Sequence, residues 1–81
     1  MVSGNVQSPG VFEAQRFITV SEAIVMAGGP SRFASPNDTI LIRTDAHGHV
    51  RRIPIQYEEI EAGRHPEQDL VLLTGDRLYM P

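Results

Sequence analysis

Histidines form the first group of residues in this chain whose types and spacing could do chemistry. His47 and His49 are two residues apart, so on a strand they would share a face and could bind a transition metal, with Asp45 and His65 as candidate further ligands. His47, however, falls in a predicted turn, and no spacing in the sequence fixes a third ligand. We therefore expect solvated histidines at the end of a hairpin and no metal site.

The second group is acidic. Glu58, Glu59 and Glu61 crowd one short stretch, and paired carboxylates in unlike environments can act as general acid and general base. Acids around a predicted helical turn are more typical of a solvated face, and the sequence has no nucleophile-elbow or oxyanion-loop motif. We expect no catalytic residues, no bound cofactor and no enzyme activity.

The third group combines arginine with tyrosine. Arg43, Arg51 and Arg52 fall on one predicted hairpin, and Tyr57 follows that hairpin closely. Both residue types are enriched in interfaces, and their planar groups also suit carboxylates, hydroxyls and the ring faces of sugars. These four residues are our candidate contacts for a neighbouring subunit or an acidic glycan, and simple solvation is the alternative interpretation.

Length and composition limit the class of protein. The chain has 81 residues, of which 41% are apolar and 21% charged, and it has no cysteine. These values fit one small globular domain and exclude disulfides and thiolate metal sites. The formal net charge of −3 argues against a nucleic-acid partner. No apolar run has the length of a membrane helix, so we expect no membrane insertion. Because the chain opens and closes within predicted strands, we expect residues 1–81 to be one domain of a longer protein.

The clearest predicted element is a helix that begins after Thr19. Thr19 and Glu22 have the spacing of a capping box, and an apolar stripe follows at helical spacing. The stripe consists of Val20, Ala23, Ile24 and Ala27. Gly28 and Gly29 then end the helix. A phosphate-binding loop would place its glycines before a helix, so we interpret this pair as a C-cap.

Several other segments have the apolar or β-branched character of strands. They are residues 2–6, 11–12, 39–44, 49–55, 70–73 and 77–80. Pro9-Gly10 predicts a turn between the first two segments, and Gly4 predicts a bulge or a close backbone approach. Segment 39–44 is expected to be central, whereas Pro54, which lacks an N–H, predicts that its strand lies at an edge or is interrupted there. Asp76 is expected to form a tight turn by accepting from nearby backbone N–H groups. One main helix on such a mixed sheet is an α+β fold, a β-grasp.

Three pieces of the sequence, in order, carry a resemblance to a known family. They are Val2-Ser3-Gly4-Asn5-Val6 with Pro9-Gly10-Val11-Phe12, then Thr19-Val20-Ser21-Glu22-Ala23-Ile24 with Ala27-Gly28-Gly29, and finally Leu70-Val71-Leu72-Leu73-Thr74-Gly75-Asp76-Arg77-Leu78-Tyr79-Met80-Pro81. Together they resemble the soluble ligand-binding β-grasp (SLBB) domain. Asn5 and Thr74 depart from the family pattern, at positions that do not threaten the fold.

The pattern is most similar to SLBB domains of bacterial polysaccharide export proteins. The resemblance implies a non-enzymatic module in the periplasm, within a protein of the outer membrane that exports capsule or exopolysaccharide. It implies neighbouring subunits of a homo-oligomeric ring as partners, and contact with the polysaccharide as a further expectation. It fixes no ligand residues. The alternative is a small-ligand-binding β-grasp domain for a soluble sugar or a corrinoid, which would need a formed apolar pocket.

Overall fold

A mixed four-stranded sheet with one main helix on one face forms the described part of the chain, which in this computed structural model comprises residues 1–11, 17–73 and 75–81. The strands are β1 (Val2–Gly4), β2 (Thr39–Thr44), β3 (Val50–Ile55) and β4 (Arg77–Met80). Their order is β1-β4-β2-β3, with β1 parallel to β4 and the other neighbours antiparallel. The predicted α+β class is therefore confirmed.

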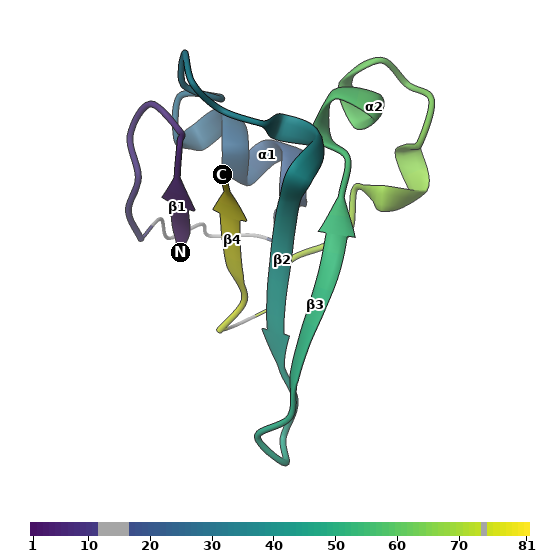
Figure 1. The fold of residues 1–81 in the computed structure, drawn as a ribbon. Coiled ribbons are helices and arrows are strands. Elements are labelled where there is room, and N and C mark those ends of the chain that lie inside the picture. Colours follow the sequence, from purple (N-terminus) through teal and green to yellow (C-terminus); the bar gives the residue numbers. More distant parts are fainter. Residues whose placement is uncertain (12–16, 74) are drawn as a thin grey trace.

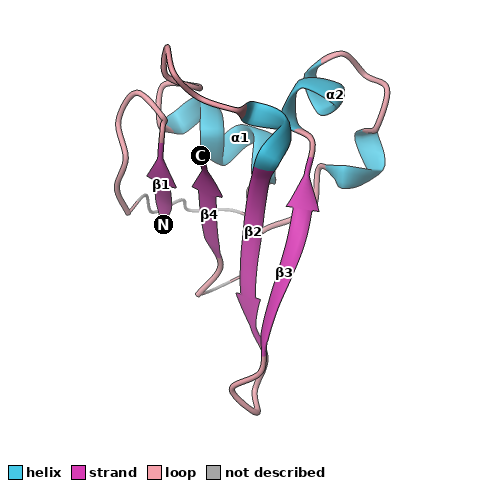
Figure 2. Ribbon diagram, viewed as in Figure 1, coloured by secondary structure: helices cyan, strands magenta, loops and turns pink. Residues whose placement is uncertain are grey.

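Two short helices and two 3₁₀ turns complete the part of the fold that the structure describes. Helix α1 (Val20–Met26) lies behind the sheet in Figure 1, and α2 (Tyr57–Glu61) lies beyond the end of β3. The 3₁₀ turns are η1 (Pro36–Asp38), which leads into β2, and η2 (Pro66–Gln68), which follows α2. Coloured by element, Figure 2 shows the same layers, with no helix of the described residues in front of the sheet. No helix in the described ranges is long and apolar enough to cross a membrane.

Helix α1 begins and ends where local sequence signals predicted. The Thr19 hydroxyl accepts from the Glu22 N–H at 3.4 Å, and the Glu22 carboxylate accepts from the Thr19 N–H at 3.3 Å, which completes the capping box. At the other end Gly28 has a φ of +85°, and the Gly29 N–H donates to the Ile24 carbonyl at 2.9 Å. These bonds satisfy groups that a helix terminus otherwise leaves unpaired.

A second acid strengthens the start of α1 from a distant part of the chain. The Asp69 carboxylate accepts from the Ser21 N–H at 2.9 Å and from the Ser21 hydroxyl at 2.7 Å. Negative charge is favourable at this end of a helix because the first N–H groups are unpaired and carry a positive partial charge. Segment 69–72 is thereby held against the start of α1.

Thr19→Ala is expected to lower the free energy of unfolding by about 1 kcal/mol, because the Glu22 N–H loses its acceptor while Asp69 continues to hold Ser21. Urea denaturation followed by circular dichroism measures the change. Thr19→Ser keeps a capping hydroxyl and should retain most of the stability. Equal losses in the two variants would contradict a role for the hydroxyl.

The core lies between α1 and the sheet. All four residues of the predicted apolar stripe of α1 are buried. They pack with alternate residues of the strands, including Leu41, Ile55, Leu78 and Met80. The intervening strand residues lie on the opposite face, which we call the open face. It is formed by Ser3, Ile40, Ile42, Thr44, Val50, Arg52, Pro54, Arg77 and Tyr79.

Gly4 allows β1 and β4 to come together closely. Its φ is +87°, and a Cβ built on it would lie 2.1 Å from the carbonyl oxygen of Met80. The sequence-based expectation of a close backbone approach at Gly4 is confirmed. The partner is a strand from the opposite end of the chain.

Two predicted features of the sheet are wrong. Pro9-Gly10 is not the tip of a turn, since Gly10 exchanges backbone hydrogen bonds of 2.8 and 2.9 Å with Val2. Segment 70–73 is not a strand of the sheet, because it lies alongside residues 18–20. Val71 forms an isolated antiparallel β-bridge with Thr19, and the Leu70 carbonyl accepts a hydrogen bond from the Val20 N–H at 2.9 Å. Phe12, predicted in the second segment, lies outside the described residues.

β2 and β3 form a hairpin, which we call the central hairpin, and the positions of both strands in the sheet were predicted correctly. β2 lies inside the sheet, between β4 and β3, and β3 forms its edge. Pro54 lies within β3, where its missing N–H costs no hydrogen bond to a further strand. The hairpin turn contains Gly48 with a φ of +81°.

Candidate functional site

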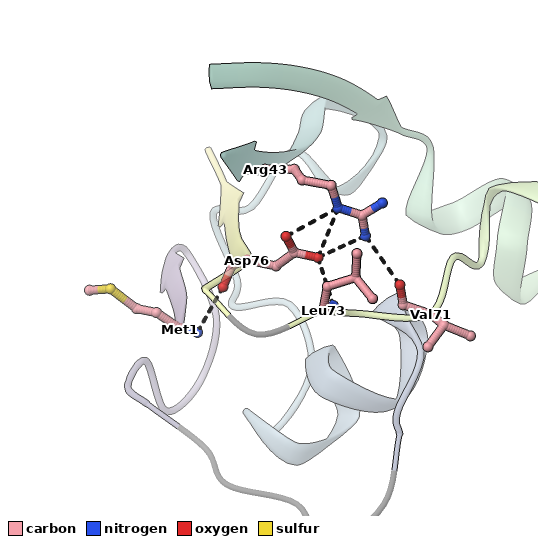
Figure 3. Close-up of polar contacts among 5 residues, drawn as sticks. All are labelled: Met1, Arg43, Val71, Leu73 and Asp76. Carbon is pink, nitrogen blue, oxygen red and sulfur yellow. Dashed lines mark hydrogen bonds and ion pairs between the residues drawn. The ribbon is translucent and has the colours of Figure 1, made fainter. Parts of the chain in front are cut away.

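An ion pair between Arg43 and Asp76 fastens the central hairpin to the turn before β4 (Figure 3). The Arg43 Nε donates to both carboxylate oxygens at 3.1 and 3.2 Å, and its Nη2 donates to Oδ2 at 2.7 Å. The same Nη2 donates to the Val71 carbonyl at 3.2 Å. Asp76 is only 8% exposed. The guanidinium is thus held by two segments of its own chain.

Asp76 is a charged group kept in a nearly buried position. Burial disfavours its charge, but hydrogen bonds from Arg43 and from the Leu73 N–H at 2.9 Å outweigh burial and lower the pKa of the carboxyl below its ordinary value. The bond from Leu73 confirms the predicted tight turn. The ion pair with Arg43 was not predicted, and it makes Arg43 a structural residue in this domain.

Tyr57 is a core residue. Its side chain is 2% exposed, and its hydroxyl donates to the Glu61 carboxylate at 2.5 Å. Burial, together with this bond, raises the pKa of Tyr57 above its ordinary value. The ring anchors α2 and has almost no surface to offer a partner.

Arg51 and Arg52 are adjacent on β3 and therefore point to opposite faces of the sheet. Arg51 is the register partner of Arg43 on the α1 side, whereas Arg52 is the register partner of Ile42 on the open face. Both side chains are exposed, and neither forms a hydrogen bond or ion pair within the described residues. The structure therefore does not gather the four predicted contact residues into one site.

The open face contains two residues that our sequence analysis did not select, Arg77 and Tyr79. Ile42 is the register partner of Arg52 on one side and of Arg77 on the other, so the two arginines flank it across three strands. Tyr79 is 43% exposed and is paired with Ile40 in the next row. The alternation of β4 could have revealed that Arg77 and Tyr79 share a face.

His47 and His49 lie together in the hairpin turn, with ring centroids 6.3 Å apart, whereas His65 has a separate local contact. The Asp45 carboxylate accepts from the backbone N–H groups of His47 and His49 at 2.8 and 2.9 Å. These bonds, that of His49 foremost, lower the pKa of Asp45. His65 contacts Glu67 at 2.8 Å. Among the residues that the structure describes, no three metal-binding side chains come together.

The acidic residues of α2 are used in separate contacts. Glu59 binds Arg64, which lowers the pKa of the Glu59 carboxyl. Glu61 accepts from the Tyr57 hydroxyl, and the exposed carboxylate of Glu58 accepts no hydrogen bond within the described ranges. Glu58 and Glu59 lie in the first turn of α2, where negative charge is favourable.

The fold is that of a β-grasp-like module, with one main helix packed on a mixed sheet. The SLBB domain family matches residues 1–54, which is two thirds of the 81-residue chain. This chain therefore belongs to the SLBB domain family, as the sequence resemblance suggested. SLBB domains bind ligands without catalysis and occur in polysaccharide export proteins. A comparison with curated proteins found no significant match.

Proposed function

We propose that this chain is a non-enzymatic SLBB module of a bacterial polysaccharide export protein. The observation that carries the proposal is the family match over residues 1–54. In this role the domain works in the periplasm, as part of an outer-membrane-associated protein. It packs against neighbouring subunits of a homo-oligomeric ring and contacts the capsular polysaccharide or exopolysaccharide that passes through.

The structure supports contacts made by side chains more than contacts made by extending the sheet. β3 is an edge strand, but it contains Pro54 and the exposed charges of Arg51 and Arg52. Proline and charged side chains on an edge are features that prevent a strand from pairing with another chain. Of the four predicted contact residues, Arg52 on the open face is therefore the one that we retain for the subunit contact. Arg51 lies on the α1 side of the sheet, and Arg43 and Tyr57 support the hairpin and α2.

A small-ligand module, for a soluble sugar or a corrinoid, is the second candidate function. One observation favours it, namely a mostly apolar groove along α1. The groove is lined by Ile18, Ser21, Glu22, Val25 and Met26. In the described part of the chain its walls come from α1 and the residue before Thr19, so it is one-sided, whereas ligand pockets usually enclose most of a ligand. This candidate therefore ranks second.

Deletion of the codons for these residues in the source bacterium tests the proposed function. We expect surface polysaccharide to be lost while synthesis inside the cell continues, because the export path would lack one of its packing modules. Polysaccharide in surface extracts and in whole-cell lysates is measured, with the restored gene as control. Unchanged surface polysaccharide would contradict the proposal.

A further inference from the structure

The open face has the composition of an interface. Its register positions hold two arginines, a tyrosine, three aliphatic residues, a proline and two hydroxyl residues, and no aspartate or glutamate. Arginine and tyrosine are enriched in protein interfaces, whereas acidic residues are depleted. No helix covers this face in Figure 2, although α1 covers the other. A flat, partly apolar surface with free positive charge is thus left without a partner within the described chain.

The two open-face arginines are placed to act together. Arg52 and Arg77 both lie beside Ile42, on strands two positions apart in the sheet, so their backbones are separated by about 10 Å. Both side chains are exposed, and neither forms an ion pair or hydrogen bond with a described residue. Such a pair would bind two carboxylates displayed on one surface.

A complementary surface lies elsewhere on the same molecule. The acidic segment, as we call it, consists of α2, η2 and the turn between them. Its carboxylates are Glu58, Glu59, Glu61 and Glu67. Glu58 and Glu67 are exposed, and the segment lies beyond the end of β3, away from the open face (Figure 1). The open face and the acidic segment therefore cannot meet within one copy.

We propose that the open face binds the acidic segment of a second copy of this chain, through Arg52 and Arg77. The inference rests on the proposed function, since it names the surfaces of the subunit contact. Because the two surfaces differ, the contact is heterologous, and its repetition closes a ring or continues as a filament. The second copy is favoured over an acidic glycan because the matching carboxylates are present on this chain.

Charge reversal on each surface tests the contact. Sedimentation equilibrium of the 81-residue chain at low ionic strength is expected to show weak self-association that salt reduces. Arg52→Glu with Arg77→Glu, or Glu58→Arg with Glu67→Arg, should each weaken it about tenfold, because attraction becomes repulsion. A mixture of the two double variants should associate again, because each then meets its complement.

Arg51→Glu is the matched control. It is matched to the single variant Arg52→Glu, because it reverses one charge on the same strand but on the α1 side of the sheet, so it should self-associate like the unmodified chain. Circular dichroism checks that every variant is folded, and a variant that does not fold is replaced by its single substitutions. Glu59 and Glu61 are left unchanged because they bind Arg64 and the buried Tyr57, whereas Glu67 contacts, among the described side chains, only His65, which is itself partly exposed to solvent.

Four results would overturn the proposed contact. One is an unmodified chain that stays monomeric at about 1 mM, the range of the weakest specific complexes. The second is a mixture of double variants that fails to associate, and the third is an Arg51→Glu variant as weak as the open-face variant. The fourth is binding of acidic polysaccharide that needs Arg52 and Arg77 without any self-association, which would assign the face to a glycan. The proposed function is tested separately, because the loss of surface polysaccharide after deletion does not depend on which surfaces of the subunits meet.

Discussion

Gly4→Ala is expected to lower the free energy of unfolding by at least about 4 kcal/mol, which is enough to unfold much of a domain of ordinary stability. A Cβ at Gly4 would lie 2.1 Å from the Met80 carbonyl oxygen, and the φ of +87° disfavours any side chain. The clash is with backbone, so it can be relieved only if β1 and β4 separate. That carbonyl also accepts from the Asn5 N–H at 2.6 Å, and this bond would be lost as well. Far-UV circular dichroism and urea denaturation measure the effect.

Gly48→Ala separates the close approach from the backbone conformation. Gly48 has a φ of +81°, but no atom lies within 4 Å of the position of a Cβ. The free energy of unfolding of this variant should therefore fall only by the cost of holding alanine at a positive φ, about 1 to 2 kcal/mol. If Gly4→Ala and Gly48→Ala were equally destabilised, the contact between β1 and Met80 would not be the cause.

The elements that the sequence predicted well are those specified by neighbouring residues. Thr19, Glu22 and the two glycines after Ala27 fix the ends of α1 through hydrogen bonds within a few residues. Pro54 predicted the edge position of β3 because a missing N–H is a local property. Gly4 likewise revealed a close approach. Its partner, Met80, could not be inferred, because parallel pairing of β1 with β4 joins the two ends of the chain.

The errors share a physical cause, which is competition from tertiary contacts. Segment 70–73 has the composition of a strand, but Asp69 binds the start of α1 and holds the following residues beside residues 18–20. Pro9-Gly10 has the composition of a turn, but Gly10 pairs with Val2. In both cases the local preference is weaker than hydrogen bonds to another segment, which is Val2 for Gly10 and residues 18–21 for segment 70–73.

The candidate site was predicted only in part, because tertiary contacts also decide which residues meet there. Residue type singled out Arg43 and Tyr57, but their partners decide their roles. Arg43 lies on the α1 side of β2 and meets Asp76, 33 residues away, while the side chain of Tyr57, the first residue of α2, is buried in the core. Arg77 and Tyr79 join Arg52 only through the order of the strands in the sheet. Spacing along the chain contains no information on that order.

Asp76→Asn is expected to lower the free energy of unfolding by about 2 to 3 kcal/mol at pH 7, because Arg43 loses its counter-ion while the amide oxygen can still accept from Leu73. The loss should shrink in acid. The pKa of Asp76 is lower in the folded state than the unfolded value of about 3.9, so its contribution is complete above that value. It disappears as the pH falls through the folded-state pKa. Urea denaturation of both proteins between pH 7 and pH 2 measures the difference.

Two further variants show whether the effect belongs to the ion pair. Asp38→Asn, in the exposed turn η1, should change stability by less than about 0.5 kcal/mol. Arg43→Met removes the other partner, and adding it to Asp76→Asn should cost less than the sum of the two single losses, because the interaction is already gone. Additive losses, or a stability difference between the two proteins that is constant with pH, would mean that the loss in Asp76→Asn does not come from the ion pair with Arg43. Since Arg43 is held inside the domain, Arg43→Met should affect stability and leave association through the open face unchanged.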